Sequence, residues 1–268
     1  MTQKDMPGIK MLFSEPVPQS PQVPAHHAYW RKIIERTARP GVTVDFTGLK
    51  QGYYGITGYE QLYDSVEMVK KACEAEQKGY DVFIIGCASD MALKECRSLV
   101  NIPVVAPTES TSLVAATLGE RFSIIDLQSY TRPVIERAVR NAGLIDKLAS
   151  IRSPEGLNAG VAGRMTREGK QDQLVEMLRS EMVKAVKEDG AEALFVSCIV
   201  TSALVYIKEL HDVEGAPVLD IMSPTIKMAE VLFDMKKAHG IGVCRRSSHL
   251  PPSAGFDINK PIMNEMKS

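Results

Sequence analysis

Two cysteines occupy matching places in the chain and could do chemistry. Cys87 ends the apolar run in "GYDVFIIGCASD", residues 79–90, and Cys198 ends the run in "GAEALFVSCIVTSA", residues 190–203. A thiolate can attack an electrophile or accept a proton, and a thiol can return one. A single cysteine at a strand end is more often a small buried hydrophobe, so the repeated placement is what favours a function.

Short β-rich runs alternate with long amphipathic stretches along the chain. We predict strands at residues 9–14, 42–46, 81–86, 102–106, 121–126, 157–163, 193–197, 216–220 and 239–244. We predict helices at residues 59–79, 89–99, 110–118, 131–142, 170–189, 201–210 and 225–238. Strand and helix in alternation indicate parallel sheets that are covered on both faces.

An internal repeat relates the two cysteine segments. Residues 79–118 and 190–232 share one order: glycine, buried strand, cysteine, polar turn, helix and a short strand opened by Pro103 or Pro217. We therefore predict an α/β fold of two pseudo-symmetric, doubly wound parallel-sheet domains with the active site between them. The first half would comprise residues 1–125 and 220–268, and the second half residues 126–219.

The cysteines should lie where such a fold binds ligands. Parallel sheets bind ligands beyond the carboxyl ends of their strands, where the next helices begin. Helix N-termini offer free N–H groups and partial positive charge, which bind carboxylate or carbonyl groups and favour a thiolate. A ligand between the halves would therefore meet a thiol on each side.

The composition narrows the partners. The chain has 268 residues, with 32 Lys and Arg against 33 Asp and Glu, so nothing draws it to nucleic acid or anionic lipid. It has neither a signal-peptide pattern nor an apolar stretch of about 20 residues, so we expect a cytoplasmic protein without membrane contact. Its five cysteines and five histidines match no metal-binding spacing, and it has no complete nucleotide-binding motif. We expect a small-molecule substrate, no metal and no cofactor.

The cysteine segments also carry a family resemblance. The strings "GCASDMAL", "IPVVAPTESTSLVAATLGERFSIID", "VSCIVTSA", "APVLDIMSPTIKMAE" and "GVCRRSSHLPP" resemble the aspartate/glutamate racemase superfamily, hydantoin racemase branch. The resemblance runs from about Gly8 to Pro252. It implies a homo-oligomer and cofactor-independent inversion at a carbon next to a carbonyl, with Cys87 and Cys198 exchanging protons on opposite faces.

That role is also reasonable physically. Two acid–base groups that flank an acidified C–H, one as thiolate and one as thiol, can invert the stereocentre. Further substrate-binding residues are expected at the strand ends and helix starts, although helix capping and packing compete as their roles. These candidates are Ser14, Tyr54, Ser89, Asp90, Glu109, Thr201 and Ser202.

Departures from the family pattern leave the reaction open. The Pro-rich "SEPVPQSPQVPAHH" replaces an Asn-Pro-Asn type of turn, and Ser197 stands where glycine is common. One alternative is a lyase or cis–trans isomerase that uses a thiolate nucleophile, of the thiohydantoin desulfhydrase, malonate decarboxylase or maleate isomerase type. Another alternative is a non-catalytic small-molecule binding protein. The presence of both cysteines argues against the single-cysteine decarboxylase.

Overall fold

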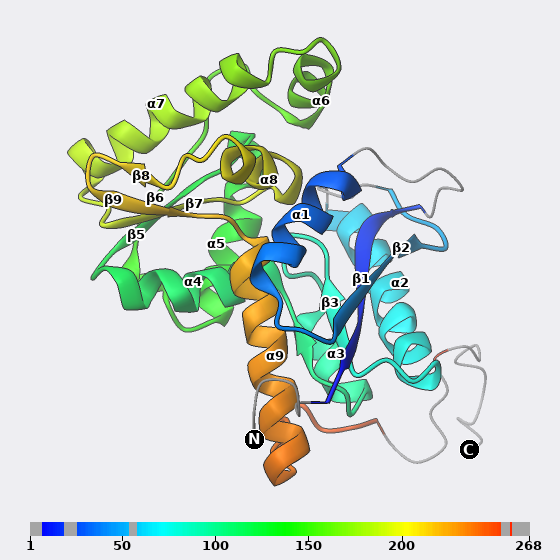
Figure 1. Cartoon of the computed structure of the whole chain (residues 1–268). Coiled ribbons are helices and arrows are strands. Elements are labelled where there is room, and N and C mark those ends of the chain that lie inside the picture. Colours follow the sequence, from blue (N-terminus) through cyan, green and yellow to red (C-terminus); the bar gives the residue numbers. More distant parts are fainter. Residues whose placement is uncertain (1–6, 19–25, 54–57, 253–257, 259–268) are drawn as a thin grey trace, which may run out of the picture.

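The first of two sheets is built from the N-terminal strands. A computed structural model describes residues 7–18, 26–53, 58–252 and 258 (Figure 1). Strands β1 (Ile9–Pro18), β2 (Val42–Leu49), β3 (Val82–Ile85) and β4 (Val104–Val105) pair in parallel in the order β2-β1-β3-β4. All four residues of β3 are buried, as expected for a strand that is covered on both faces.

Helices cover both faces of this sheet. One face packs against α1 (His27–Thr37) and α9 (Met222–His239) through a core that includes Phe13, Trp30 and Ile226. The other face packs against α2 (Gly58–Gln77) and α3 (Leu93–Leu99) through a core that includes Phe83 and Met68. Neighbouring residues of β3 thus enter opposite cores, which is the alternation of a doubly wound sheet.

The second sheet follows the same plan. Strands β6 (Leu148–Arg152), β5 (Phe122–Ile125), β7 (Ala193–Val196) and β9 (Ala216–Leu219) are parallel neighbours in that order, and β8 (Asp212–Val213) adds an antiparallel edge. One face carries α4 (Pro107–Leu118) and α5 (Arg132–Asn141). The other carries α6 (Ala159–Arg167), α7 (Gln171–Asp189) and α8 (Ile199–Ile207). Short 3-10 turns lie at Ser129–Thr131 and Ile145–Lys147.

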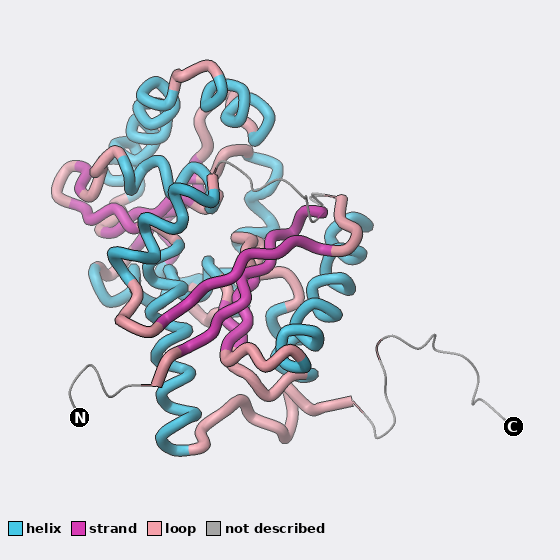
Figure 2. The backbone as a smooth tube through the Cα atoms, turned by 45° about the vertical axis from the view of Figure 1, so that its right-hand side comes forward, coloured by secondary structure: helices cyan, strands magenta, loops and turns pink. Residues whose placement is uncertain are grey.

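Helices α4 and α9 exchange sides between the sheets. Helix α4 follows a strand of the first sheet but packs on the second, and α9 follows a strand of the second sheet but packs on the first. The two helices also pack against each other, and both views show the two halves side by side (Figures 1 and 2). The predicted α/β fold with two parallel-dominated sheets is confirmed.

The boundary between the sheets differs from the expected one. Strand β5 pairs with β6 and β7, so the chain changes sheets between β4 and β5, before the expected limit of the first half at residue 125. The return of residues 220–268 to the first half agrees with the packing of α9 for the part of that segment that the structure describes. The division into domains stays a prediction.

Two of the predicted strands were wrong. Residues 157–163 were expected to form a strand, but α6 begins at Ala159, because the Asn158 side chain accepts a hydrogen bond from the Val161 N–H and caps the helix. Residues 239–244 form no strand: α9 ends at His239 and is capped by Gly240, whose φ of +67° suits glycine. Strand β6 and helix α1 were not predicted. None of the described helices has the length and apolar character that crossing a membrane requires.

Candidate active site

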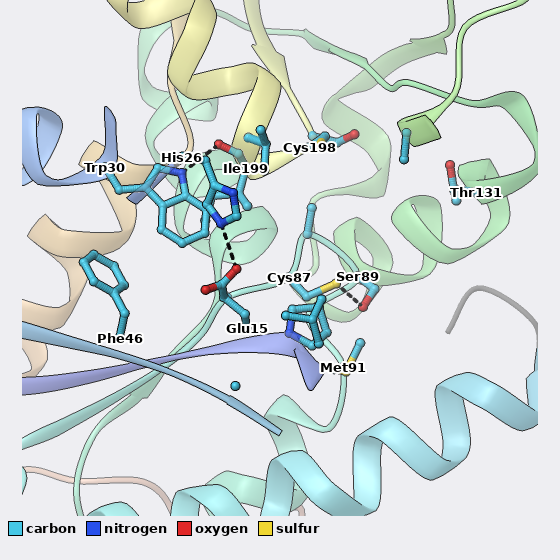
Figure 3. Close-up of a pocket in the computed structure, with 18 of the residues that line it drawn as sticks. Glu15, His26, Trp30, Phe46, Cys87, Ser89, Met91, Thr131, Cys198 and Ile199 are labelled. Carbon is cyan, nitrogen blue, oxygen red and sulfur yellow. Dashed lines mark hydrogen bonds and ion pairs between the residues drawn. The ribbon is translucent and has the colours of Figure 1, made fainter. Parts of the chain in front are cut away.

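A cavity of about 720 Å³ lies between the two halves and is lined by residues from both. Its walls include Gly86 and Cys87 beyond β3, and Ser197 and Cys198 beyond β7. Both cysteines line it, and Figure 3 shows Cys87 and Cys198 on separate segments of the chain around it. The cavity thus lies beyond the carboxyl ends of parallel strands, which is the usual ligand site of such sheets.

The two cysteines occupy equivalent backbone positions. In the first half, the Gly86 N–H donates to the Ser14 carbonyl at 2.7 Å, and Cys87 follows. In the second half, the Ser197 N–H donates to the Ile125 carbonyl at 3.0 Å, and Cys198 follows. The internal repeat in the sequence therefore corresponds to the same backbone pairing in both sheets, with a cysteine one residue beyond the last hydrogen bond.

Cys87 lies in a tight turn rather than at a helix start. Its Sγ is 3.2 Å from Ser89 Oγ, and the turn holds Asp90 and Ala92 at φ values of +49° and +55°. Such backbone is strained for residues other than glycine and is common at functional sites. Helix α3 begins only at Leu93, so the predicted helix N-terminus at Cys87 was wrong.

The environment of Cys87 also changes its acidity. Burial raises the pKa of the thiol, whereas the hydrogen bond with Ser89 acts in the opposite direction. Nearby Asp90 and Cys198 contribute further to the increase through charge repulsion. The expectation of a lowered pKa was therefore wrong for Cys87, because desolvation of the thiolate outweighs the available hydrogen bonds.

Asp90 fastens the Cys87 turn to helix α4. Its carboxylate accepts hydrogen bonds from the backbone N–H groups of Thr108 at 2.9 Å and Glu109 at 2.6 Å. The Thr108 hydroxyl donates to the Ala88 carbonyl at 2.6 Å. Burial raises the pKa of Asp90 to about 8, against the two N–H donors, which favour the carboxylate. Asp90 positions the turn and is not among the described residues that line the cavity.

Glu109 also lies behind this turn. Its carboxylate receives two hydrogen bonds from Arg97, from Nη1 to Oε1 at 3.0 Å and from Nη2 to Oε2 at 2.5 Å. Arg97 Nε donates in turn to the Val104 carbonyl at 3.1 Å. The Glu109 carboxylate is thus used to join α3 to α4, and Glu109 is likewise absent from the described lining.

Ser14 and Gly86 close the wall behind Cys87. Ser14 is fully buried, and its hydroxyl has no hydrogen-bond partner among the described residues. A Cβ atom at Gly86 would lie 2.2 Å from the Phe13 ring, so only glycine fits between β3 and β1 at this point. Ser14 therefore supports the wall and does not reach the cavity in the described structure.

Cys198 differs from Cys87 in its local structure. It occupies the N-cap position of α8, so the prediction of a helix start is met on this side. Thr201 Oγ1 donates to the Cys198 carbonyl at 3.2 Å, and Ser202 Oγ accepts from the Ile221 N–H at 2.9 Å. Thr201 and Ser202 are buried and belong to the packing of α8, and the described cavity lining includes neither.

Asp126 stands beside Cys198 in the cavity wall. Its Oδ1 accepts hydrogen bonds from Ser197 Oγ at 2.6 Å and from the Leu127 N–H at 2.8 Å, and its Oδ2 accepts one from Thr131 Oγ1. Burial raises the pKa of Asp126, and these hydrogen bonds oppose the increase. Ser197 stands where glycine is common in the family, and its hydroxyl holds the buried Asp126 carboxyl group on the same side of the cavity as Cys198.

Glu15, His26 and His27 form a polar group on the wall near the end of β1. His26 Nε2 lies 2.9 Å from Glu15 Oε2 (Figure 3), and His27 Nε2 lies 2.5 Å from Glu15 Oε1. Burial alone would raise the pKa of Glu15, but the interactions with both imidazoles outweigh it and lower the pKa. Aromatic rings of Trp30 and Phe46 line the cavity next to this group.

Comparisons with known proteins decide the family. The family described as Asp/Glu/Hydantoin racemase matches residues 25–231, which is well over half of the chain. The chain belongs to this family. The predicted superfamily and its hydantoin branch are therefore confirmed.

The relatives include proteins named hydantoin racemase and allantoin racemase. The hydantoin racemase of Pseudomonas sp. (strain NS671) is 28% identical over 201 residues, 75% of this chain and 78% of that protein. The hydantoin racemase of Paenarthrobacter aurescens is 27% identical over 196 residues, 73% of this chain and 78% of that protein. The solved allantoin racemase from Klebsiella pneumoniae shares the fold with a TM-score of 0.75 at 21% identity, covering 92% of this chain and 94% of that one.

Within this racemase-family site, the predicted residues fall into three groups. Three line the cavity: Cys87, Ser89 and Cys198. Five lie behind its described wall: Ser14, Asp90, Glu109, Thr201 and Ser202. Tyr54 lies outside the described residues.

Sequence reasoning missed several polar lining residues, among them Glu15, His26, His27 and Asp126. The two acids could have been found by extending the internal repeat upstream, because Glu15 and Asp126 each come directly after the residues of β1 and β5 that pair with β3 and β7. The histidines were expected only to pack or to face solvent.

Proposed function

We propose that the protein is a cofactor-independent racemase that inverts a carbon next to a carbonyl group, with Cys87 and Cys198 as the acid–base pair. The observation that carries this proposal is that both thiols line one cavity from register-equivalent positions. The predicted enzyme class, an isomerase of the racemase type, is supported by relatives that are named hydantoin and allantoin racemases.

The proposed step needs one thiolate and one thiol. The thiolate removes the proton from the carbon, the adjacent carbonyl takes up the negative charge, and the opposite thiol protonates the other face. The raised pKa of Cys87 keeps it protonated near neutral pH, so we assign it the proton-donor role in the resting enzyme. Free N–H groups at the start of α8, beside Cys198, are suited to hydrogen-bond the carbonyl oxygen as it gains charge.

The lining favours a compact ring with an apolar substituent. Aromatic and aliphatic side chains form much of the wall: Trp30, Phe46, Met91, Ile135 and Ile199. The volume of about 720 Å³ suits a small molecule. We propose a hydantoin-like or amino-acid-derived substrate, in agreement with what the relatives' names say of them.

The proposal also includes the location and the assembly state of the enzyme. We expect the enzyme to act as a cytoplasmic homo-oligomer on a small-molecule substrate.

The alternatives that use a thiolate nucleophile are less favoured: the unliganded arylmalonate decarboxylase structure matches with a TM-score of 0.55, against 0.75 for the allantoin racemase.

A substrate panel in deuterated water tests the proposal. Single enantiomers of 5-substituted hydantoins, allantoin and free amino acids would be incubated with the enzyme and followed by polarimetry and mass spectrometry. Loss of optical rotation together with incorporation of one deuterium at the chiral carbon is the expected result. Release of carbon dioxide or sulfide would identify a lyase instead, and binding without turnover across the panel would favour a binding protein.

A further inference from the structure

Glu15 brings two imidazoles to one point of the cavity wall. The carboxylate lies between His26 and His27, with one oxygen against each Nε2 atom, at 2.9 and 2.5 Å. One nitrogen of each imidazole and one carboxylate oxygen lie within 4.8 Å of one another. All three residues line the cavity that holds the two thiols, so a ligand on the trio would be accessible from it.

Packing holds the trio in place. Glu15 and His27 are 6% and 7% exposed, and the His27 ring stacks on Phe46 with centroids 4.6 Å apart. The His26 ring lies 4.5 Å from the Trp30 ring. Side chains that are confined in this way lose little freedom when they bind a ligand, which favours tight binding.

We propose that Glu15, His26 and His27 form a binding site for a divalent cation of the zinc class. Two imidazole nitrogens and one carboxylate oxygen are the donor set of open zinc sites, where three protein ligands leave a fourth position free. Here the free position would face the cavity. The proposal does not depend on racemisation, because it concerns what this wall binds.

Binding a metal requires the three side chains to move toward a common centre. Zinc–ligand bonds of about 2.0–2.1 Å in a tetrahedron place ligand atoms about 3.3 Å apart. The two imidazoles contact different oxygens of Glu15, at 2.9 and 2.5 Å, and one ligand atom from each residue lies within 4.8 Å of the others. The short contacts must therefore lengthen by less than about 1 Å, and no separation must shorten by more than about 1.5 Å. The imidazoles bind through neutral Nε2 atoms, so a proton on Nε2 moves to Nδ1 or leaves to water.

The charge of the cavity lining favours a cation. Among the described lining residues, Glu15, Asp45 and Asp126 can carry negative charge, and Arg31 carries positive charge. With neutral histidines, the described lining therefore has more carboxyl groups than cationic groups. A dication would offset that excess, and Coulomb attraction is stronger in a partly enclosed cavity than in water.

The test is metal binding by the full chain after removal of metals with a chelator. Zinc would be titrated in competition with a chromophoric chelator, and Co²⁺ would serve as the spectroscopic probe of the ligands. We expect one equivalent to bind with nitrogen and oxygen ligation. E15Q and H26Q should each weaken binding at least tenfold, about 1.4 kcal/mol. The matched control H239Q removes an exposed histidine at the end of α9 and should bind as the parent does.

Cys87 and Cys198 line the same cavity and could bind the metal instead, so their variants test the ligand assignment. The double variant C87S/C198S should retain the site and its Co²⁺ spectrum. Loss of binding in that variant, or a sulfur-to-cobalt charge-transfer band in the parent, would assign the metal to the cysteines and overturn the proposal. Unchanged affinity in E15Q, or no binding in the parent, would overturn it as well. Thermal melting checks each fold, and H26Q is the milder change because the His26 side chain is 25% exposed.

Discussion

Glu15 and Asp126 hold equivalent positions in the two halves of the molecule. The pairing of β1 with β3 ends at Ser14 and Ile85, and the pairing of β5 with β7 ends at Ile125 and Val196. Glu15 and Asp126 are the residues that come next. Both line the cavity. The halves therefore repeat an acid as well as a thiol, although the acids have different partners.

The Asp126 partners predict a local effect on the second thiol. D126N should lower kcat and lower the free energy of unfolding by about 1–3 kcal/mol. The Ser197 and Thr131 hydroxyls donate to different oxygens of Asp126, and asparagine keeps only one of those oxygens, so one hydroxyl loses its acceptor. D146N, a change at an exposed position in the second half, is the control. Steady-state kinetics and urea unfolding measure both effects. Wild-type kcat in a folded D126N would show that Asp126 has no part in turnover.

Exchange on each face should separate the two cysteines. C87S and C198S should each lose about 10²- to 10⁴-fold in racemisation, because serine is a far weaker acid than a thiol. Each variant should still wash deuterium into one enantiomer, and the two variants should prefer opposite enantiomers. C244S, at an exposed cysteine, should behave as wild type. Full racemisation in either active-site variant would exclude the two-base mechanism.

Ser89 should tune the acidity of Cys87. Its hydrogen bond lowers the pKa of a thiol that burial raises, so S89A should shift the titration of Cys87 to higher pH. The rate of iodoacetamide alkylation at Cys87, followed by peptide mass spectrometry against pH, measures the shift. S180A changes an exposed serine on α7 and should leave the curve in place. An S89A curve that moves to lower pH would contradict this assignment.

The cysteine pair could be predicted because its evidence is local and repeated. Strand, cysteine and turn recur in one order, and the strand register preserves that equivalence in space. The Glu15–His26–His27 group could not be predicted in this way. The carboxylate is 11 and 12 residues from its partners, across a Pro-rich segment without periodicity, and nothing local says that the chain returns to the same wall.

Elements were missed where local signals were ambiguous. Helix α1 carries Trp30, Ile33 and Ile34 on its buried face, a helical spacing that could have predicted it despite the prolines before it. Residues 157–163 are small and glycine-rich, so periodicity alone separates strand from helix poorly there. Asp90 and Glu109 were correctly placed near strand ends, but only the tertiary structure shows that their carboxylates face α4 and Arg97.

Asp90 makes stability depend on pH in a definite direction. A carboxyl whose pKa is about 8 when folded holds its proton longer than the unfolded chain does. Its contribution is therefore fully present below about pH 4 and is lost as the pH rises through 8. D90N cannot ionise, so its stability relative to wild type should improve from pH 4 to pH 8 in urea unfolding. A difference that moves the other way would show that the α4 N–H donors dominate.

Trp30 should report ligand binding between the halves. It is the only tryptophan of the chain, it lines the cavity, and its Nε1 donates to the Ile199 carbonyl at 3.3 Å, which joins α1 to the start of α8. A ligand that draws the halves together changes the surroundings of this ring. We expect saturable quenching or a spectral shift of its fluorescence on titration with a non-reacting hydantoin analogue.

W30F provides the control and a second readout of the same contact. The variant should lose the fluorescence change and lower the free energy of unfolding by at least the value of one neutral hydrogen bond, about 0.5–1.5 kcal/mol, because Phe cannot donate to Ile199. Urea unfolding measures that loss, and calorimetry measures analogue binding independently of fluorescence. If calorimetry shows saturation of the wild type while Trp30 emission stays constant, the ligand binds away from this wall and the halves do not close around it.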